Sequence, residues 1–433
     1  MADLTTKLAG VTSPNPFWLA SAPPTNTGGQ VMRAFEAGWG GAVWKTLGQP
    51  VENVTSRFGA LDYAGRKIMG FNNIELITDR PLETNLKEMY EVKKRFPKHA
   101  LIASLMVETR EEWREIIKKV EDAGSDAIEL NFGCPHGMCE RGMGSAVGQE
   151  PKVLEVITGW TKEFAKIPVI VKLTPNISDI TVPAAAARRA GADAVSLINT
   201  IKSIIGVDLD QFVPYPTVDG KSTNGGYCGP AVKPIAMHMV GAIARKNGNA
   251  LPVSGIGGIS DWKDAVEFMM LGAGTVQVCT AVMHYGYRIV EDMIQGMSDY
   301  MDAKGFRSTS ELVGRAIPNY TDWGSLNRRH TLLAKIHQEH CIGCNLCVVA
   351  CDDGGHQCID LNPEFRADTN PTNINLHRTT RKAPIVREEE CVGCNLCSLV
   401  CPAPGAITME TVPYRPAYGS VTDIKLNGPR AGH

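Results

Sequence analysis

The sequence lacks an excess of charge of either sign, and it lacks long hydrophobic runs. Its 44 Lys and Arg residues nearly balance its 46 Asp and Glu residues, for a formal net charge of -2. This balance gives no indication of a nucleic-acid partner or of an acidic tail. The short apolar runs predict no transmembrane helix, and no signal segment opens the chain. We therefore expect a cytoplasmic protein without a membrane partner.

Two further absences bear on cofactors and cross-links. No Gly-x-Gly-x-x-Gly unit follows an early strand candidate, so we expect no site for NAD or FAD in this chain. Disulfides are not expected in a cytoplasmic protein, although the chain has 13 cysteines. Nine of them fall between Cys341 and Cys401, and this change of composition marks a second module.

Short apolar segments alternate with helix-length segments over the first 300 residues or so. The helical segments carry apolar residues at three- and four-residue spacing, as in Glu111 to Ala123. Eight such units predict a (β/α)8 TIM barrel, with a doubly wound open sheet as the alternative. The expected strands are Phe17–Ala20, Ala42–Lys45, Leu101–Leu105, Asp126–Leu130, Val169–Leu173, Ala194–Ile198, Leu251–Ser254 and Thr275–Val278.

Composition divides the chain into four expected segments. Residues 1–305 form the barrel, and residues 306–335 form a helical or irregular connector. Residues 336–412 form a ferredoxin-like module, and residues 413–433 form an extended tail rich in Pro, Gly and Tyr. The long stretch from Thr46 to Pro81 exceeds an ordinary loop between strand and helix, so we expect it to carry function.

The second module contains two cysteine runs of the same spacing. Cys341-Ile-Gly-Cys-Asn-Leu-Cys-Val-Val-Ala-Cys351 is repeated as Cys391-Val-Gly-Cys-Asn-Leu-Cys-Ser-Leu-Val-Cys401. This is the spacing of bacterial two-cluster ferredoxins, in which the fourth cysteine of one run binds the other cluster. The first [4Fe–4S] cluster is then expected on Cys341, Cys344, Cys347 and Cys401, and the second on Cys391, Cys394, Cys397 and Cys351.

Zinc is the alternative for these runs, but a pair of zinc sites does not explain why the final three-residue gap occurs twice. Asp352 stands where a proline is usual after the fourth cysteine, which changes the turn but removes no ligand. Cys358 is left over by the spacing, and we expect it to be a buried packing thiol.

Clusters move single electrons, so the barrel must hold the group that uses them. Ser254-Gly-Ile-Gly-Gly258 follows the seventh expected strand, and Cys279-Thr280 ends the eighth. Backbone N–H groups at these strand ends commonly bind phosphate in this fold. A mononucleotide flavin, FMN, fits this pattern, because it takes two electrons and exchanges them singly with a cluster.

Polar side chains mark the ends of several other strands. Lys45 and Lys172 end the second and fifth strands, where a cation stabilises the negative charge of a reduced flavin. Asn73, Asn131 and Asn199-Thr200 offer both donors and acceptors, which suits an amide or imide ring. Each of these residues alone could equally be a solvent-facing lysine or a turn residue.

Cys134 is the candidate proton donor. It lies in a Gly-rich loop that begins at Asn131, directly after the apolar run Asp126 to Leu130. A thiol can donate a proton near neutral pH when a loop holds it over a substrate. A structural thiol or a metal ligand paired with Cys139 is the alternative, and His136 either tunes Cys134 or contacts the substrate.

Several of these stretches resemble the dihydropyrimidine dehydrogenase family, most closely the FMN and iron–sulfur subunit of its bacterial NAD-dependent members. With the cysteine runs, the resemblance covers nearly the whole chain. It is carried by Asn131-Phe-Gly-Cys-Pro-His-Gly-Met-Cys-Glu-Arg-Gly-Met-Gly144, Phe71-Asn-Asn-Ile-Glu-Leu76, Val171-Lys-Leu-Thr-Pro-Asn176, Asn199-Thr200 and Gln277-Val-Cys-Thr280.

The resemblance implies reduction of uracil or thymine to the 5,6-dihydro form, the first step of pyrimidine catabolism. It implies hydride transfer from N5 of FMN to C6 and protonation of C5 by Cys134 from the opposite face. The implied pyrimidine site is Asn73, Asn131, Phe132, Gly133, His136, Asn199 and Thr200. The implied FMN site is Ala20, Ser21, Lys45, Thr46, Asn73, Asn131, Lys172, Asn199, Gly229, Gly255, Gly257, Gly258, Cys279 and Thr280.

The chain departs from the family pattern at Gly133, where Ser is usual, and at Cys139, where Gly is usual. The family reaction also needs NAD(P)H and FAD, which implies an FAD- and NAD-binding flavoprotein partner in a hetero-oligomer such as a heterotetramer. Two alternatives differ in function. One is a dihydroorotate dehydrogenase that oxidises dihydroorotate, and the other is a non-catalytic electron-transfer subunit.

Overall fold

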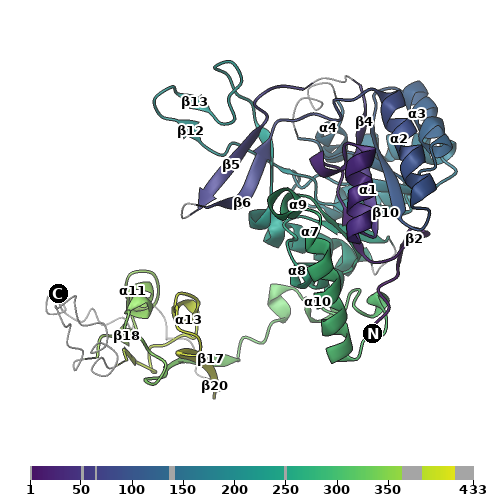
Figure 1. Cartoon of the computed structure of the whole chain (residues 1–433). Coiled ribbons are helices and arrows are strands. Elements are labelled where there is room, and N and C mark those ends of the chain that lie inside the picture. The colour runs from purple at the N-terminus through teal and green to yellow at the C-terminus, as the bar shows by residue number, and fades with distance from the viewer. Residues whose placement is uncertain are drawn as a thin grey trace. The chain divides into compact units, whose positions relative to one another are not determined.

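The computed structural model describes residues 2–49, 53–63, 66–135, 142–247, 251–362 and 383–414. The chain separates into two compact units, Met1–Tyr320 and Thr321–His433 (Figure 1). Among the described residues, none of the helices combines the length and the apolar character that crossing a membrane requires.

The first unit is built around a closed barrel of eight parallel strands. Each overlaps one of the strands expected from the sequence, so the (β/α)8 barrel is confirmed and the open sheet is wrong. The strands are β3 (Phe17–Leu19), β4 (Gly41–Gly48), β7 (Ala100–Met106), β8 (Ala127–Asn131), β9 (Val169–Lys172), β10 (Ala194–Leu197), β15 (Val253–Ile256) and β16 (Ala273–Val278).

Helices cover the outside of the barrel (Figure 1). Strands such as β4 and β7 are buried along their whole length, because parallel strands have the barrel core on one side and helices on the other. The covering helices are α1 (Gly28–Ala37), α2 (Leu82–Arg95), α3 (Arg110–Asp122), α5 (Pro151–Phe164), α6 (Thr181–Arg189), α7 (Lys233–Asn247), α8 (Trp262–Met270) and α10 (Ile289–Lys304).

Local sequence explains where several of these helices begin. Thr109 and Glu112 form a reciprocal capping box at the start of α3, and Asp261 and Asp264 do the same for α8. Strands β1 (Thr6–Leu8) and β2 (Val11–Ser13) form a hairpin. Leu8 packs in a cluster with residues at the starts of the barrel strands, so the hairpin closes the end of the barrel at which the strands begin. The opposite ends of the strands are left to form a site.

Loops at the carboxyl ends of the strands form a second, antiparallel sheet. Its strand order is β11 (Ile201–Ser203), β14 (Gly225–Cys228), β6 (Arg66–Asn73) and β5 (Phe58–Tyr63). Strands β5 and β6 occupy much of the long stretch after Thr46, so that stretch contains a hairpin. The sheet joins this stretch to the loop after β10. The paired residues Asn73 and Gly226 are 153 positions apart along the chain.

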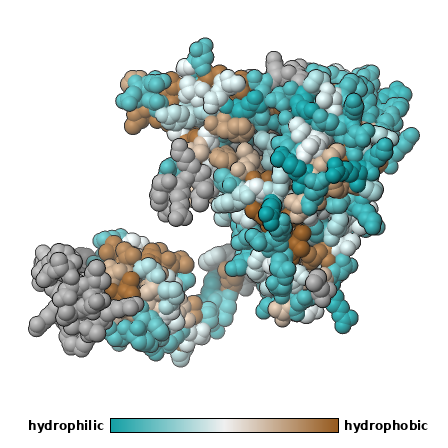
Figure 2. Space-filling view, viewed as in Figure 1, coloured by the Kyte–Doolittle hydropathy of each residue, from teal (hydrophilic) through white to brown (hydrophobic). Residues whose placement is uncertain are grey.

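A hairpin of β12 (Val207–Asp208) and β13 (Val213–Pro214) extends from the loop after β10 (Figure 1). Its tip carries exposed apolar side chains, Leu209 and Phe212. In the space-filling view, brown hydrophobic residues lie beside white and teal ones in this part of the surface (Figure 2). The short elements that remain in this unit are η1 (Pro23–Thr25), α4 (Ser145–Gln149), η3 (Pro230–Val232), α9 (Thr280–Tyr285), η4 (Thr309–Glu311) and η5 (Ile317–Asn319). Leu312, between the last two, is fully buried in the barrel core.

The second unit repeats one small motif. Strand β17 (Thr331–Ile336) pairs antiparallel with β20 (Ile407–Val412), and β18 (Ile359–Asp360) pairs with β19 (Ile385–Val386). Two short helices, α11 (Leu346–Asp352) and α13 (Leu396–Leu399), follow the cysteine turns, and η6 (Trp323–Ser325) precedes β17. Asn345 and Asn395 take left-handed φ values of 60° and 69° directly before the two helices. The repeat seen in the sequence is therefore present in the backbone.

Candidate active site

A cavity opens at the carboxyl ends of the barrel strands. It encloses about 1130 Å³, including its open mouth, and is lined by residues of the barrel and of the antiparallel sheet. Most residues that the resemblance implied for FMN or pyrimidine line it. They are Ala20, Ser21, Lys45, Thr46, Asn73, Asn131, Cys134, Lys172, Asn199, Thr200, Gly229, Gly257, Gly258, Cys279 and Thr280.

Three implied residues do not line this cavity. Phe132 is 2 % exposed and packs edge-on against Trp113, with ring centroids 6.4 Å apart. A Cβ at Gly255 would meet Phe268 at 2.6 Å, and a Cβ at Gly133 would meet the Cβ of Asn199 at 2.3 Å. Phe132 therefore belongs to the core, and Gly133 allows the loop to pass close to Asn199. His136 and Cys139 lie outside the described residues.

A bulge in the barrel directs Lys45 and Thr46 into the cavity. The register between β4 and β7 shifts between Trp44 and Leu47, and the two residues inside this shift are the ones that line the site. Bulges commonly re-aim side chains beside active sites. The site therefore depends on an irregularity that no strand pattern in the sequence announces.

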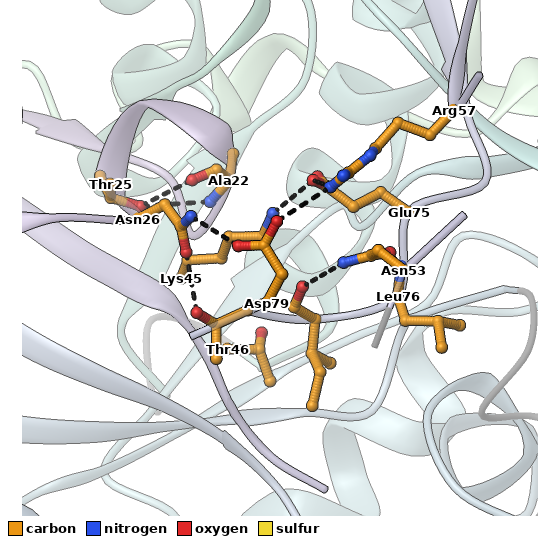
Figure 3. Close-up of polar contacts among 12 residues, drawn as sticks. Ala22, Thr25, Asn26, Lys45, Thr46, Asn53, Arg57, Glu75, Leu76 and Asp79 are labelled. Atoms are coloured by element: carbon orange, nitrogen blue, oxygen red, sulfur yellow. Dashed lines mark hydrogen bonds and ion pairs between the residues drawn. The ribbon is translucent and has the colours of Figure 1, made fainter. Parts of the chain in front are cut away.

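Lys45 takes part in a buried charge network with the long loop after β4 (Figure 3). Its Nζ lies 2.7 Å from Glu75 Oε1, and Nη1 of Arg57 lies 2.9 Å from the same oxygen. Arg57 also reaches Asp79, which accepts a hydrogen bond from Asn26 Nδ2 at 3.1 Å. Burial lowers the pKa of Lys45, although Glu75 opposes this shift. Neither Glu75 nor Arg57 was among the residues expected at the site, although Glu75 lies in the stretch Phe71 to Leu76 that carries the resemblance.

Lys172 stands over a second buried acid at the base of the cavity. Its Nζ is 3.6 Å from Oε1 of Glu129, which is fully buried within β8. The other oxygen of Glu129 accepts hydrogen bonds from Ser196 Oγ at 2.8 Å and Gln277 Nε2 at 3.1 Å. Neither Glu129 nor Gln277 was among the residues expected at the site, although Gln277 lies in a stretch that carries the resemblance and an acid inside an apolar strand run was a usable signal.

Amide side chains form a chain of hydrogen bonds across the cavity wall. Asn199 Nδ2 donates to Asn131 Oδ1 at 2.9 Å, and Asn131 Nδ2 donates to Thr46 Oγ1 at 3.0 Å. Thr46 in turn shares a hydrogen bond with Ser104 Oγ at 2.9 Å. Asn73, from the antiparallel sheet, lines the same cavity. The structure therefore brings together three asparagines that come from separate strands and loops.

Glycines shape another wall of the cavity, near the start of α9. Gly229, Gly257 and Gly258 have φ values of +114°, +131° and +72°, which side-chain-bearing residues rarely adopt. A Cβ at Gly258 would meet the backbone oxygen of Gly229 at 2.9 Å. Helix α9 begins at Thr280, and the first N–H groups of a helix lack intrahelical partners. This wall therefore suits an anionic group.

Two further thiols lie at this wall, Cys228 and Cys279. Burial raises the pKa of both thiols. Cys228 donates through Sγ to the carbonyl of Phe71 at 3.4 Å. Both thiols are therefore protonated at neutral pH and are poor nucleophiles.

Cys134 lines the cavity and is 5 % exposed. It packs against Ile77, Met106 and Met143, and its carbonyl accepts a hydrogen bond from Ser145 N at 2.9 Å. The chain returns to Cys134 just after the undescribed residues 136–141. The backbone of Cys134 is therefore held by a hydrogen bond, while the residue lines the cavity.

The cysteines of the second unit form two groups that match the crossed ligand rule. One cavity of about 310 Å³ is bordered by Cys341, Cys344, Cys347 and Cys401, and one of about 340 Å³ by Cys351, Cys391, Cys394 and Cys397. In the described parts of the chain, no three His, Cys, Asp or Glu side chains are grouped as a single metal ion requires. Cys358, expected to be a packing thiol, is buried and borders the second of these cavities.

Comparisons with known proteins agree with this architecture. A family model described as dihydroorotate dehydrogenase matches residues 3–301, and one described as a 4Fe-4S dicluster domain matches residues 334–409. The chain is 43% identical over 366 residues to the NAD-dependent dihydropyrimidine dehydrogenase subunit PreA of Escherichia coli (strain K12). That match covers 84% of this chain and 89% of the relative.

Two other relatives show how widely related barrels are distributed among oxidoreductases. The chloroplastic dihydropyrimidine dehydrogenase (NADP(+)) of Arabidopsis thaliana is 42% identical over 76% of this chain and 80% of its own length. The catalytic subunit of dihydroorotate dehydrogenase B (NAD(+)) from Thermococcus kodakarensis is 38% identical over 73% of this chain and 99% of its own length. The chain therefore belongs to the dihydroorotate dehydrogenase family of barrel oxidoreductases, and within it to the dihydropyrimidine dehydrogenases.

Proposed function

We propose that the chain reduces the 5,6 double bond of uracil or thymine with electrons that reach the barrel through two [4Fe–4S] clusters. The observation that carries this proposal is one cavity that contains Cys134, three asparagines and two lysines. A pyrimidine ring presents carbonyl and N–H groups in alternation, and asparagine side chains offer both complements. The relatives named dihydropyrimidine dehydrogenase support the same substrate class.

FMN is the cofactor that the barrel family implies, and the cavity wall fits it. Oε1 of Gln277 is buried without a hydrogen-bond partner among the residues that the structure describes, so it can accept from a bound ring. Gly257, Gly258 and the start of α9 would hold the phosphate, while Lys45 and Lys172 would hold the flavin ring. When bound, FMN supplies the hydride that reduces C6 of the pyrimidine.

The remaining chemistry falls to residues of the chain. Asn73, Asn131, Asn199 and Thr200 orient the pyrimidine by hydrogen bonds to its carbonyl and N–H groups. Cys134 donates its Sγ proton to C5, which completes the addition of hydrogen across the double bond. The low exposure of Cys134 limits competition from water for this proton.

The four cysteines at each small cavity are proposed as the ligands of one cluster, in the crossed arrangement described above. The name of the E. coli relative as a subunit, and as NAD-dependent, supports a hetero-oligomer in which another chain binds NAD(P)H and FAD. The absence of a dinucleotide motif in this sequence agrees with that division.

The decisive experiment compares substrates on the purified, cluster-containing chain. Under anaerobic conditions with a dye as electron carrier, we expect turnover with uracil and thymine and little with dihydroorotate. Turnover with dihydroorotate alone would favour the dihydroorotate dehydrogenase activity, which the 38% identical relative makes the second candidate. Full activity after Cys134→Ala would instead indicate a barrel that only transfers electrons.

A further inference from the structure

Cys358 is the one thiol of the second cavity that the ferredoxin spacing does not use. It follows Cys351 by seven residues and is 3 % exposed. It borders the same cavity as the four cysteines proposed to hold the second cluster. A [4Fe–4S] cluster takes four cysteine ligands, so this cavity contains one thiol more than the cluster requires.

The backbone contact of Cys358 favours Cys351 as the acceptor of the two neighbouring thiols. Sγ of Cys358 lies 3.6 Å from Sγ of Cys351. The backbone N–H of Cys358 donates to the same Cys351 sulfur at 3.4 Å. Ligand sulfurs point outward from separate iron corners of a cubane, so two sulfurs in hydrogen-bond contact cannot both be ligands. The sulfur of Cys351 accepts a hydrogen bond from the backbone, as a thiolate ligand does.

We propose that Cys358 is a positioning residue of the second cluster. Its S–H group donates a hydrogen bond to the thiolate of Cys351. This inference rests on the ligand assignment proposed above. Hydrogen bonds to cluster sulfurs stabilise the more negative, reduced state and so raise the reduction potential. Cys391, another proposed ligand of the same cluster, borders the same cavity as Cys358.

The other half of the repeat provides an internal comparison. Cys358 directly precedes β18 and borders the second cavity, while Ala406 directly precedes β20 and borders the first. Ala406 has no polar side-chain atom, so the first cluster lacks this donor from the equivalent position. The two cluster sites therefore differ at this position. The second has a thiol donor, Cys358, where the first has Ala406.

The same geometry makes Cys358 a reserve ligand. If Cys351 is replaced by alanine, the neighbouring thiol can lose its proton to solvent and form the missing iron–sulfur bond. No electron is gained or lost in this exchange of ligands. A packing thiol that faced away from the cavity could not substitute in this way.

The test uses the full chain purified anaerobically, with iron and sulfide counted and cluster potentials measured by EPR-monitored redox titration. In Cys358→Ala we expect about eight iron atoms per chain to remain and one cluster to shift to lower potential, with the other unchanged. Cys358→Ser, whose hydroxyl also donates, is expected to restore part of the shift. The matched variant Ala406→Cys is expected to raise the potential of the other cluster.

Ligand replacement gives the second arm of the test. Cys351→Ala is expected to keep both clusters, and Cys351→Ala with Cys358→Ala is expected to lose half of the iron. An unchanged potential in Cys358→Ala would show a packing thiol, and loss of half the iron in that single variant would make Cys358 the native ligand. Either result overturns the proposal. Fewer than about four iron atoms in the unmodified chain would instead refute the cluster assignment itself.

Discussion

Replacement of Glu75 by glutamine tests whether the buried charge network at the cavity is held by that carboxylate. Glu75 Oε1 receives both Lys45 Nζ at 2.7 Å and Arg57 Nη1 at 2.9 Å. The side chains of Lys45 and Glu75 are 6 % and 9 % exposed, whereas Arg57 is 25 % exposed and also reaches Asp79. Arg57 therefore keeps a partner in the variant, and Lys45 carries most of the cost.

The expected loss of stability follows from this burial. Removal of one partner from a buried ion pair costs about 3–5 kcal/mol, because it leaves an uncompensated buried charge. Glutamine keeps an acceptor oxygen near Lys45, and the cavity admits water, so we expect a value of about 3 kcal/mol at pH 7. As the exposed control, Glu36→Gln disrupts the Arg95–Glu36 pair, with side chains 60 % and 48 % exposed, and should cost less than about 1 kcal/mol.

The loss of stability should also depend on pH, with a sign set by Lys45. Burial already lowers the pKa of Lys45, and removal of the Glu75 charge lowers it further. Between that lowered pKa and the ordinary lysine value, the unfolded chain binds more protons, so stability rises with pH. In Glu75→Gln this window starts at lower pH. The difference in stability from the unmodified protein therefore shrinks as pH rises.

Urea unfolding without added flavin measures this difference, with tryptophan fluorescence as the signal. Trp18, Trp39, Trp44 and Trp113 are fully buried in the barrel unit and report on its unfolding. A change below about 0.5 kcal/mol at pH 7, or a difference that does not vary between pH 7 and 10, would refute the reasoning.

Three further predictions concern the cavity. Cys134→Ala should lower turnover with uracil by about 10²–10⁴-fold with flavin and iron contents unchanged, and a loss of flavin would point to a structural role instead. Gly258→Ala should weaken FMN binding in a fluorescence titration, because the added Cβ would meet Lys233 Cβ at 2.8 Å; unchanged affinity would contradict the phosphate assignment. Lys172→Met should lower the flavin midpoint potential more than Lys45→Met, and equal shifts in spectroelectrochemical titrations would contradict this order.

The barrel was predictable because its strands are short, apolar and buried on both faces. Strands β4, β7 and β8 arise from short runs of mostly apolar residues that are adjacent in the sequence. The spacing of the cysteine runs can likewise be read from neighbouring residues. The antiparallel sheet was not predictable, because β6 finds its partner β14 through pairs such as Asn73 and Gly226. Such pairing depends on where the barrel brings the loop ends, which no local pattern encodes.

The site shows the same division between local and non-local information. Residues at strand ends, such as Lys172 and Asn131, could be placed at the cavity from the strand pattern alone. Glu75 could not, because its role depends on a bulge that turns Lys45 toward it. The place of Cys358 beside Cys351 likewise depends on the turn after α11, which brings together two residues seven positions apart. These contacts arise from tertiary packing, so the sequence shows which residue types are present but does not show that they meet.

Lys45 and Lys172 were expected to have the same role from their places at strand ends. They differ in where the carboxylate that pairs with each of them lies. Glu75 lines the cavity beside Lys45, so the two opposite charges at this wall largely offset each other for a bound ligand. Glu129 does not line the cavity and lies behind Lys172, held by Ser196 and Gln277. A ligand therefore meets the ammonium group of Lys172 before the carboxylate that balances it. Because Coulomb energy falls with distance, Lys172 is the lysine placed to stabilise negative charge in the cavity, and Lys45 serves more to fix the loop after β4.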